Sequence, residues 1–161
     1  MSNNYRGAQF WIRAWWPVAL SAAVIAFEST AWFGADRTSG PLRAIWQALF
    51  GSVSAEQWLI LGHLIRKVGH FVGYGIIGLM WLRAWHLTLP RLKILPGVLL
   101  ALLGTALIAS CDEFHQSFIP SRTGSPWDVV LDCSGAAVMC LAAWGITRLT
   151  RPRRMGQLSA G

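Results

Sequence analysis

The feature that most constrains the fold is a stretch of eighteen residues, Ile94 to Cys111, without a single charged side chain. A helix needs about 20 predominantly apolar residues to cross the hydrocarbon core of a bilayer. Three further apolar stretches accompany it, within residues 15–33, 68–85 and 126–147. The pattern therefore predicts an all-α membrane protein with four transmembrane helices.

Composition supports this class and argues against a soluble domain. Hydrophobic residues make up 54% of the chain and charged residues only 13%, whereas charged residues make up roughly a quarter of an ordinary soluble domain. The tryptophans lie mostly near the ends of the apolar stretches, as is typical of side chains at the bilayer interface. The net charge of +7 does not indicate a nucleic-acid partner, because the basic residues flank the apolar stretches and form no stripe.

The first span is expected to run from Trp15 to Phe33, with residues 1–14 as a cytoplasmic segment. A cleaved signal peptide is the alternative, but the length of the apolar run favours a retained span. Glu28 lies near the far end of this span, where its carboxylate either reaches the interface or faces the helix bundle. Apolar residues then recur at helical spacing from Leu42 to Phe50, which predicts an interfacial amphipathic helix between spans 1 and 2.

A capping box over Ser54 to Gln57 predicts the start of a helix that continues into the second span. On this helix Lys67, His70 and Tyr74 are spaced i, i+3 and i+7, so they share one face. Small residues in the same span are expected to let a neighbouring helix approach closely. These are Gly69, Gly73, Gly75 and Gly78.

Polar side chains gather where the third span ends and the fourth begins. Asp112 and Glu113 directly follow the third apolar stretch, and Gln116 shares a helical face with Asp112. A serine and a proline at positions 125–126 then predict the start of the next helix. Its first turns place three residues on one face, namely Asp128, Asp132 and Gly135. Whether Cys111 and Cys133 pair is left open by their spacing.

The distribution of basic residues predicts the orientation. With both termini in the cytoplasm, nine of the fourteen basic residues lie inside, including those of a basic cytoplasmic tail, residues 148–161. The positive-inside rule favours this arrangement. All seven acidic residues then belong to the outer half, together with Lys67, His70 and Arg122. We expect a shared polar site there, because charges at the ends of separate spans are costly unless they are paired or hydrated.

Several motifs resemble those of the VanZ-like family of membrane proteins. The first is Arg66-Lys67-Val68-Gly69-His70-Phe71 with Tyr74 and Gly78. The second is Asp112-Glu113-Phe114-His115-Gln116, followed by Pro120, Arg122, Asp128 and Gly135. The sequence departs from the family pattern at Ser121, usually glycine, and at Asp132, commonly asparagine. The resemblance covers residues 15–147 and implies a small multi-helix membrane protein of bacteria, whose namesake is associated with resistance to the lipoglycopeptide teicoplanin.

The outer cluster supports two functional hypotheses. In the first, it binds the head group of an envelope lipid or cell-wall precursor, with Lys67 and Arg122 at a phosphate. The other binding candidates are Glu28, Tyr74, Gln116, Asp128 and Asp132. In the second, the protein is a membrane enzyme that acts on a lipid-linked phosphate or glycosyl substrate. His70 then serves as acid or base, and Asp112 or Glu113 is its partner carboxylate.

Two other interpretations of the same residues remain. A metal site that uses His70, Asp112, Glu113 and His115 is disfavoured, because HExxH spacing is missing and nearby cations repel a metal ion. We therefore expect no metal and no other cofactor. Alternatively, the cluster is a salt-bridged cap that fixes the four helices, with Lys67 and Arg122 each paired to an acid. The sequence leaves the ligand and the oligomeric state open.

Overall fold

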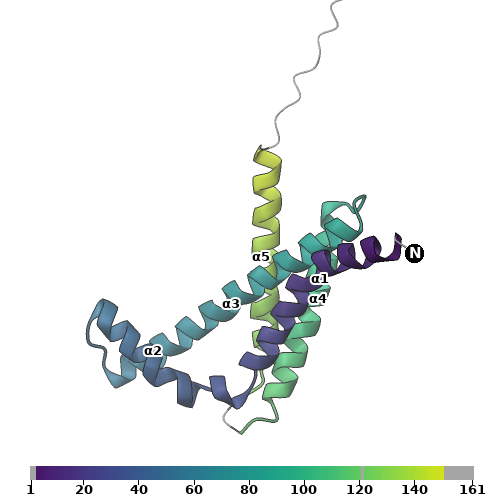
Figure 1. The fold of residues 1–161 in the computed structure, drawn as a ribbon. Helices are drawn as coiled ribbons and strands as arrows, with labels where there is room; N and C mark the ends of the chain where they lie inside the picture. The colour runs from purple at the N-terminus through teal and green to yellow at the C-terminus, as the bar shows by residue number, and fades with distance from the viewer. Residues whose placement is uncertain (1–2, 121, 151–161) are drawn as a thin grey trace, which may run out of the picture.

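Every regular element in the described part of the chain is helical (Figure 1). The computed structural model describes residues 3–120 and 122–150, so Ser121 and residues 151–161 of the predicted basic tail lie outside it. The elements are α1 (Asn3–Glu28), a short 3-10 helix η1 (Ala31–Phe33), α2 (Ala35–Phe50), α3 (Ala55–Thr88), α4 (Ile94–Gln116) and α5 (Pro126–Thr150).

Three of these helices are long and apolar enough to cross a membrane, which makes the chain a multi-pass membrane protein. They are α1 over Gly7–Glu28, α4 and α5. Large apolar side chains on their outer faces, such as Leu95, Leu99 and Leu103 of α4, are exposed as lipid-facing side chains are. The expected span over residues 68–85 lies within α3 but is not among the three, because Arg83 and His70, together with Tyr74 and the glycines, lower its mean hydropathy. The fourth span stays a prediction.

One predicted end of a span is wrong. The first span ends at Glu28 and not at Phe33, because the Thr30 hydroxyl donates to the carbonyl of Phe27 at 2.7 Å and the chain turns into η1. The helix that contains the third span continues past Cys111 to Gln116, which agrees with the helical face that Asp112 and Gln116 were expected to share. These polar residues therefore lie in the last turns of α4.

Helix α3 is the central element and packs against α1, α2, α4 and α5. Its 34 residues span about 51 Å at 1.5 Å per residue, well beyond the ~30 Å hydrocarbon core. The capping box at its start is confirmed: Gln57 N donates to the Ser54 hydroxyl, and the Gln57 side chain accepts from Ser54 N. Its first turns and α2 lie to one side of the bundle in Figure 1. Helix α2 contains the residues from Leu42 to Phe50 and so confirms the helix predicted there. The position of this helix on the membrane surface stays a prediction.

A close crossing of α3 and α5 sets the register of the bundle. A Cβ atom added to Gly78 would lie 2.7 Å from the Cβ of Ala136, and one added to Gly135 would overlap the carbonyl oxygen of Phe71. The predicted role of Gly78 is therefore confirmed, as is that of Gly75, which lies against Met139.

The same prediction is wrong for Gly69 and Gly73, where an added Cβ would meet nothing within 4 Å. Both glycines line a small cavity, described below, so they lie beside open space and not against a neighbouring helix.

Candidate functional site

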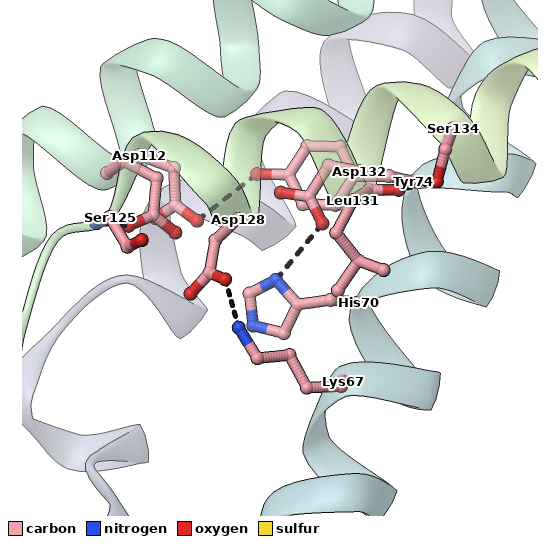
Figure 2. Close-up of polar contacts among 10 residues, drawn as sticks. Lys67, His70, Tyr74, Asp112, Ser125, Asp128, Leu131, Asp132 and Ser134 are labelled. Carbon is pink, nitrogen blue, oxygen red and sulfur yellow. Dashed lines mark hydrogen bonds and ion pairs between the residues drawn. The ribbon is translucent and has the colours of Figure 1, made fainter.

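One face of α3 meets α5 through two charged contacts (Figure 2). Lys67 Nζ forms an ion pair with Asp128 Oδ1, and one turn further His70 Nδ1 lies 3.4 Å from Asp132 Oδ1. The second contact lacks hydrogen-bond geometry but is close enough for electrostatic attraction. The Lys67 and Asp128 side chains are partly exposed, whereas Asp132 is fully buried. The charges thus become less accessible to solvent along α3.

The same face of α3 meets α4 through a buried hydrogen bond. The Tyr74 hydroxyl donates to Asp112 Oδ2 at 3.1 Å, and the two residues are only 1% and 6% exposed. The other oxygen of Asp112 is buried without a hydrogen-bond partner among the described residues, and so are both oxygens of Asp132. Because buried polar atoms nearly always have a hydrogen-bond partner, these atoms are candidates for contact with water or a ligand.

A cavity of about 90 Å³ lies beside this hydrogen bond. Polar side chains from α1, α3, α4 and the loop between α4 and α5 line it, together with one apolar residue and two glycines. The lining residues are Ile25, Glu28, Gly69, His70, Gly73, Tyr74, Asp112, Gln116 and Arg122. A water molecule takes up about 30 Å³ in the liquid, so the cavity accepts one small polar group and excludes a whole lipid head group.

Arg122 joins the α4–α5 loop to the end of α1. Its Nη2 donates to the carbonyl oxygens of Glu28 at 2.7 Å and Thr30 at 3.2 Å, which satisfies carbonyl groups left free at a helix end. Its Nε is buried without a partner in the described part of the chain. The cap hypothesis therefore holds for Lys67, which pairs with an acid, but is wrong for Arg122, which binds backbone carbonyls.

The two remaining acidic candidates lie differently. Glu28 is exposed and also lines the cavity, so both alternatives for its carboxylate stay open. Glu113 is buried but does not line the cavity, and its Oε2 accepts a hydrogen bond from Ser125 N at 2.7 Å. This bond fixes the start of α5, so Glu113 shapes the site from outside it.

Sequence reasoning missed one polar contact near the cavity. Ser29 is 2% exposed, and its hydroxyl shares a hydrogen bond of 2.8 Å with His115 Nδ1, which ties the end of α1 to α4. The signal in the sequence was a serine and a threonine directly after Glu28, within a run that otherwise reads as apolar. Ile25, Gly69 and Gly73 were also not predicted as cavity residues.

The chemistry available at the site is that of carboxylates, one imidazole, one phenol, one guanidinium and the carboxamide of Gln116, which is buried. All three cysteines are free thiols in the structure, so Cys111 and Cys133 do not pair there. Over residues 3–120 and 122–150, no group of three or more His, Cys, Asp or Glu side chains is placed to hold a metal ion.

Comparison with known proteins gives one result. Residues 10–148 match the family model described as VanZ/LLP1, which is most of the chain. Neither curated proteins nor solved structures gave a significant match.

Proposed function

The chain belongs to the VanZ/LLP1 family, and from that premise we propose that its cavity binds the polar head group of an envelope lipid or lipid-linked cell-wall precursor. The VanZ family is bacterial. We place the protein in the bacterial cytoplasmic membrane with the cavity toward the outside, because the positive-inside rule favours that orientation.

One observation carries the proposal: two side chains of opposite charge line the same small cavity, and each has one buried atom without a hydrogen-bond partner among the described residues. Asp112 presents a buried oxygen and Arg122 a buried Nε, neither with a partner among the described residues. A ligand that carries both an anionic and a donor group, such as a phosphate beside a hydroxyl or an amine, would satisfy both side chains. The cavity takes the end of such a head group, and the rest of the lipid lies against the apolar faces of the helices.

The structure changes the expected division of roles between the two basic residues. Lys67 is engaged by Asp128 and does not line the cavity. Arg122 lines the cavity and is the better partner for a phosphate, because its Nε is buried without a hydrogen-bond partner among the described residues. We therefore assign the phosphate contact to Arg122 and a helix-joining role to Lys67.

Native mass spectrometry of the protein released from its own membranes tests the proposal. The wild type is compared with Arg122→Ala and Asp112→Asn, and with Asp36→Asn, which removes an exposed carboxylate of α2 away from the cavity. A discrete bound lipid is expected on the wild type and on Asp36→Asn, and it should be lost from the two cavity variants. Equal retention by all four proteins would contradict the proposal.

The contact between His70 and Asp132 favours a second candidate, a membrane enzyme that acts on a lipid-linked phosphate or glycosyl substrate. A buried carboxylate beside one ring nitrogen orients an imidazole for proton transfer by the other nitrogen, and His70 lines the cavity. Incubation of the wild type with a lipid extract of the membranes it comes from should then yield a new product. The His70→Gln variant should not form this product, although the variant should still retain the lipid. No product from the wild type would remove this candidate.

The resemblance to the family's namesake suggests a cellular readout. If head-group binding serves resistance, expression of the protein should raise the teicoplanin concentration needed to stop growth. Expression of Asp112→Asn at the same level should not. Equal effects of the two proteins would mean that any resistance does not depend on the cavity.

A further inference from the structure

A second and much larger hollow lies at the opposite end of the bundle. Beyond the contact between Gly78 and Ala136, α5 diverges from the C-terminal part of α3 and the N-terminal part of α4 (Figure 1). The divergence leaves a groove of about 1050 Å³ between the three helices. Its walls are largely apolar and include Leu82 of α3, Val98 of α4 and Leu141 of α5. An apolar groove between membrane helices is unfavourable when filled with water, so it requires an apolar occupant.

The rim of this groove is basic. Arg83 of α3, Lys93 at the start of α4 and Arg148 of α5 are all exposed and all line it. None of the three forms an ion pair in the part of the chain that the structure describes. The sequence has no acidic residue between Glu56 and Asp112, and none after Asp132. The positive charge at this end therefore has no partner within the described groove.

The existing contacts of the cations are with uncharged groups. Arg83 donates to the carbonyls of Arg13 at 3.4 Å and Ala14 at 3.2 Å on α1, and the guanidinium of Arg148 lies 4.7 Å from the centre of the Trp144 ring. None of these contacts neutralises the charge. Helix α4 also begins at this rim without a side-chain cap, so amides of its first turn add to the positive potential.

From this charge complementarity we propose that the groove is a binding site for an anionic phospholipid. The phosphate lies at Arg83, Lys93 and Arg148, and an acyl chain lies along the apolar walls. Ligand pockets commonly occupy roughly 300–1,000 Å³, so the volume suffices for a head group and part of its chains. This site is separate from the cavity at the other end and does not depend on the function proposed for it.

Titration of the full-length protein in detergent micelles with defined lipids tests the proposal by native mass spectrometry. The probes are phosphatidylglycerol and phosphatidylcholine with identical acyl chains. The wild type should bind phosphatidylglycerol more tightly. Lys93→Gln and Arg148→Gln should each weaken phosphatidylglycerol binding about fivefold, the usual effect of one cation near an anionic lipid, and should leave phosphatidylcholine binding unchanged.

Two controls separate the groove from general surface charge. Arg91→Gln removes the same charge two residues from Lys93, and Arg91 does not line the groove, so this variant should bind as the wild type does. Ala143→Trp fills the groove without a change in charge and should weaken binding of phosphatidylglycerol. Asp112→Asn at the far cavity should have no effect, so the two proposals fail independently.

Three outcomes would overturn the proposal. The first is equal affinity of the wild type for the two lipids. The second is an effect of Arg91→Gln as large as that of Lys93→Gln, and the third is unchanged binding by Ala143→Trp. Each would mean that the groove is not the binding site. Thermal unfolding of every variant in the same micelles checks that a loss of binding is not a loss of folding.

Discussion

Replacement of Gly135 by alanine tests the crossing that brings the site residues together. The new Cβ would overlap the carbonyl oxygen of Phe71 and lie 2.9 Å from its carbonyl carbon. Both atoms belong to the α3 backbone and cannot rotate away, so α5 must move. Overpacking of this kind costs about 1–3 kcal/mol.

Gly145→Ala is a matched control on the same helix, because a Cβ there would meet nothing within 4 Å. Both substitutions gain the same helix preference of alanine over glycine, up to about 1 kcal/mol. That gain cancels in the comparison. Gly135→Ala should therefore be less stable than Gly145→Ala by about 1–3 kcal/mol.

Reversible unfolding in mixed micelles measures this difference. The fraction of denaturing detergent is raised stepwise, and helix content is followed by circular dichroism. A second readout follows from the geometry. Asp128 and Asp132 lie on the face of α5 that carries Gly135, so a shift of α5 should loosen their contacts with Lys67 and His70. Equal stability of Gly135→Ala and Gly145→Ala would refute the close crossing.

Three other perturbations have defined outcomes. Tyr74→Phe leaves both Asp112 oxygens without a described partner and should destabilise the fold by about 1–3 kcal/mol in the same unfolding assay; an unchanged midpoint would contradict the hydrogen bond. Ser54→Ala removes the cap of α3 and should cost about 1 kcal/mol, seen as faster amide exchange in the first turn of α3 only. In a variant whose three native cysteines are replaced by alanine, Thr123→Cys should react with a membrane-impermeant maleimide in intact cells, and Arg91→Cys only after lysis; the reverse pattern would mean the opposite orientation.

Helical periodicity was enough to predict which polar residues share a face. The spacing of Lys67, His70 and Tyr74, and that of Asp128 and Asp132, placed each set on one side of its helix, as the structure has them. These predictions succeed because side-chain direction along a helix depends only on local geometry.

The pairing between helices was not predictable in the same way. That Lys67 meets Asp128 while Tyr74 meets Asp112 depends on the register of α3 against two other helices. Contacts such as that of Gly135 with Phe71 set this register, and such contacts follow from packing of the whole bundle. For the same reason, Gly69 and Gly73 could not be told apart from the packing glycines Gly75 and Gly78. The sequence shows the surplus of basic residues at the other end of the bundle but not the groove that they line.

The most direct test of the central claim, that the small cavity holds the end of a lipid head group, is to fill the cavity without any change in charge. Gly73 lines it, and a Cβ there would meet no protein atom within 4 Å, so alanine fits the fold. A methyl group close to a water molecule in size would take up about a third of the volume. Native mass spectrometry of protein from its own membranes compares this variant with Gly145→Ala.

The account predicts that the wild type and Gly145→Ala carry the same discrete lipid, and that Gly73→Ala loses it while its unfolding midpoint does not fall. Retention of the lipid by Gly73→Ala at the wild-type level would contradict the claim that the head group occupies this cavity.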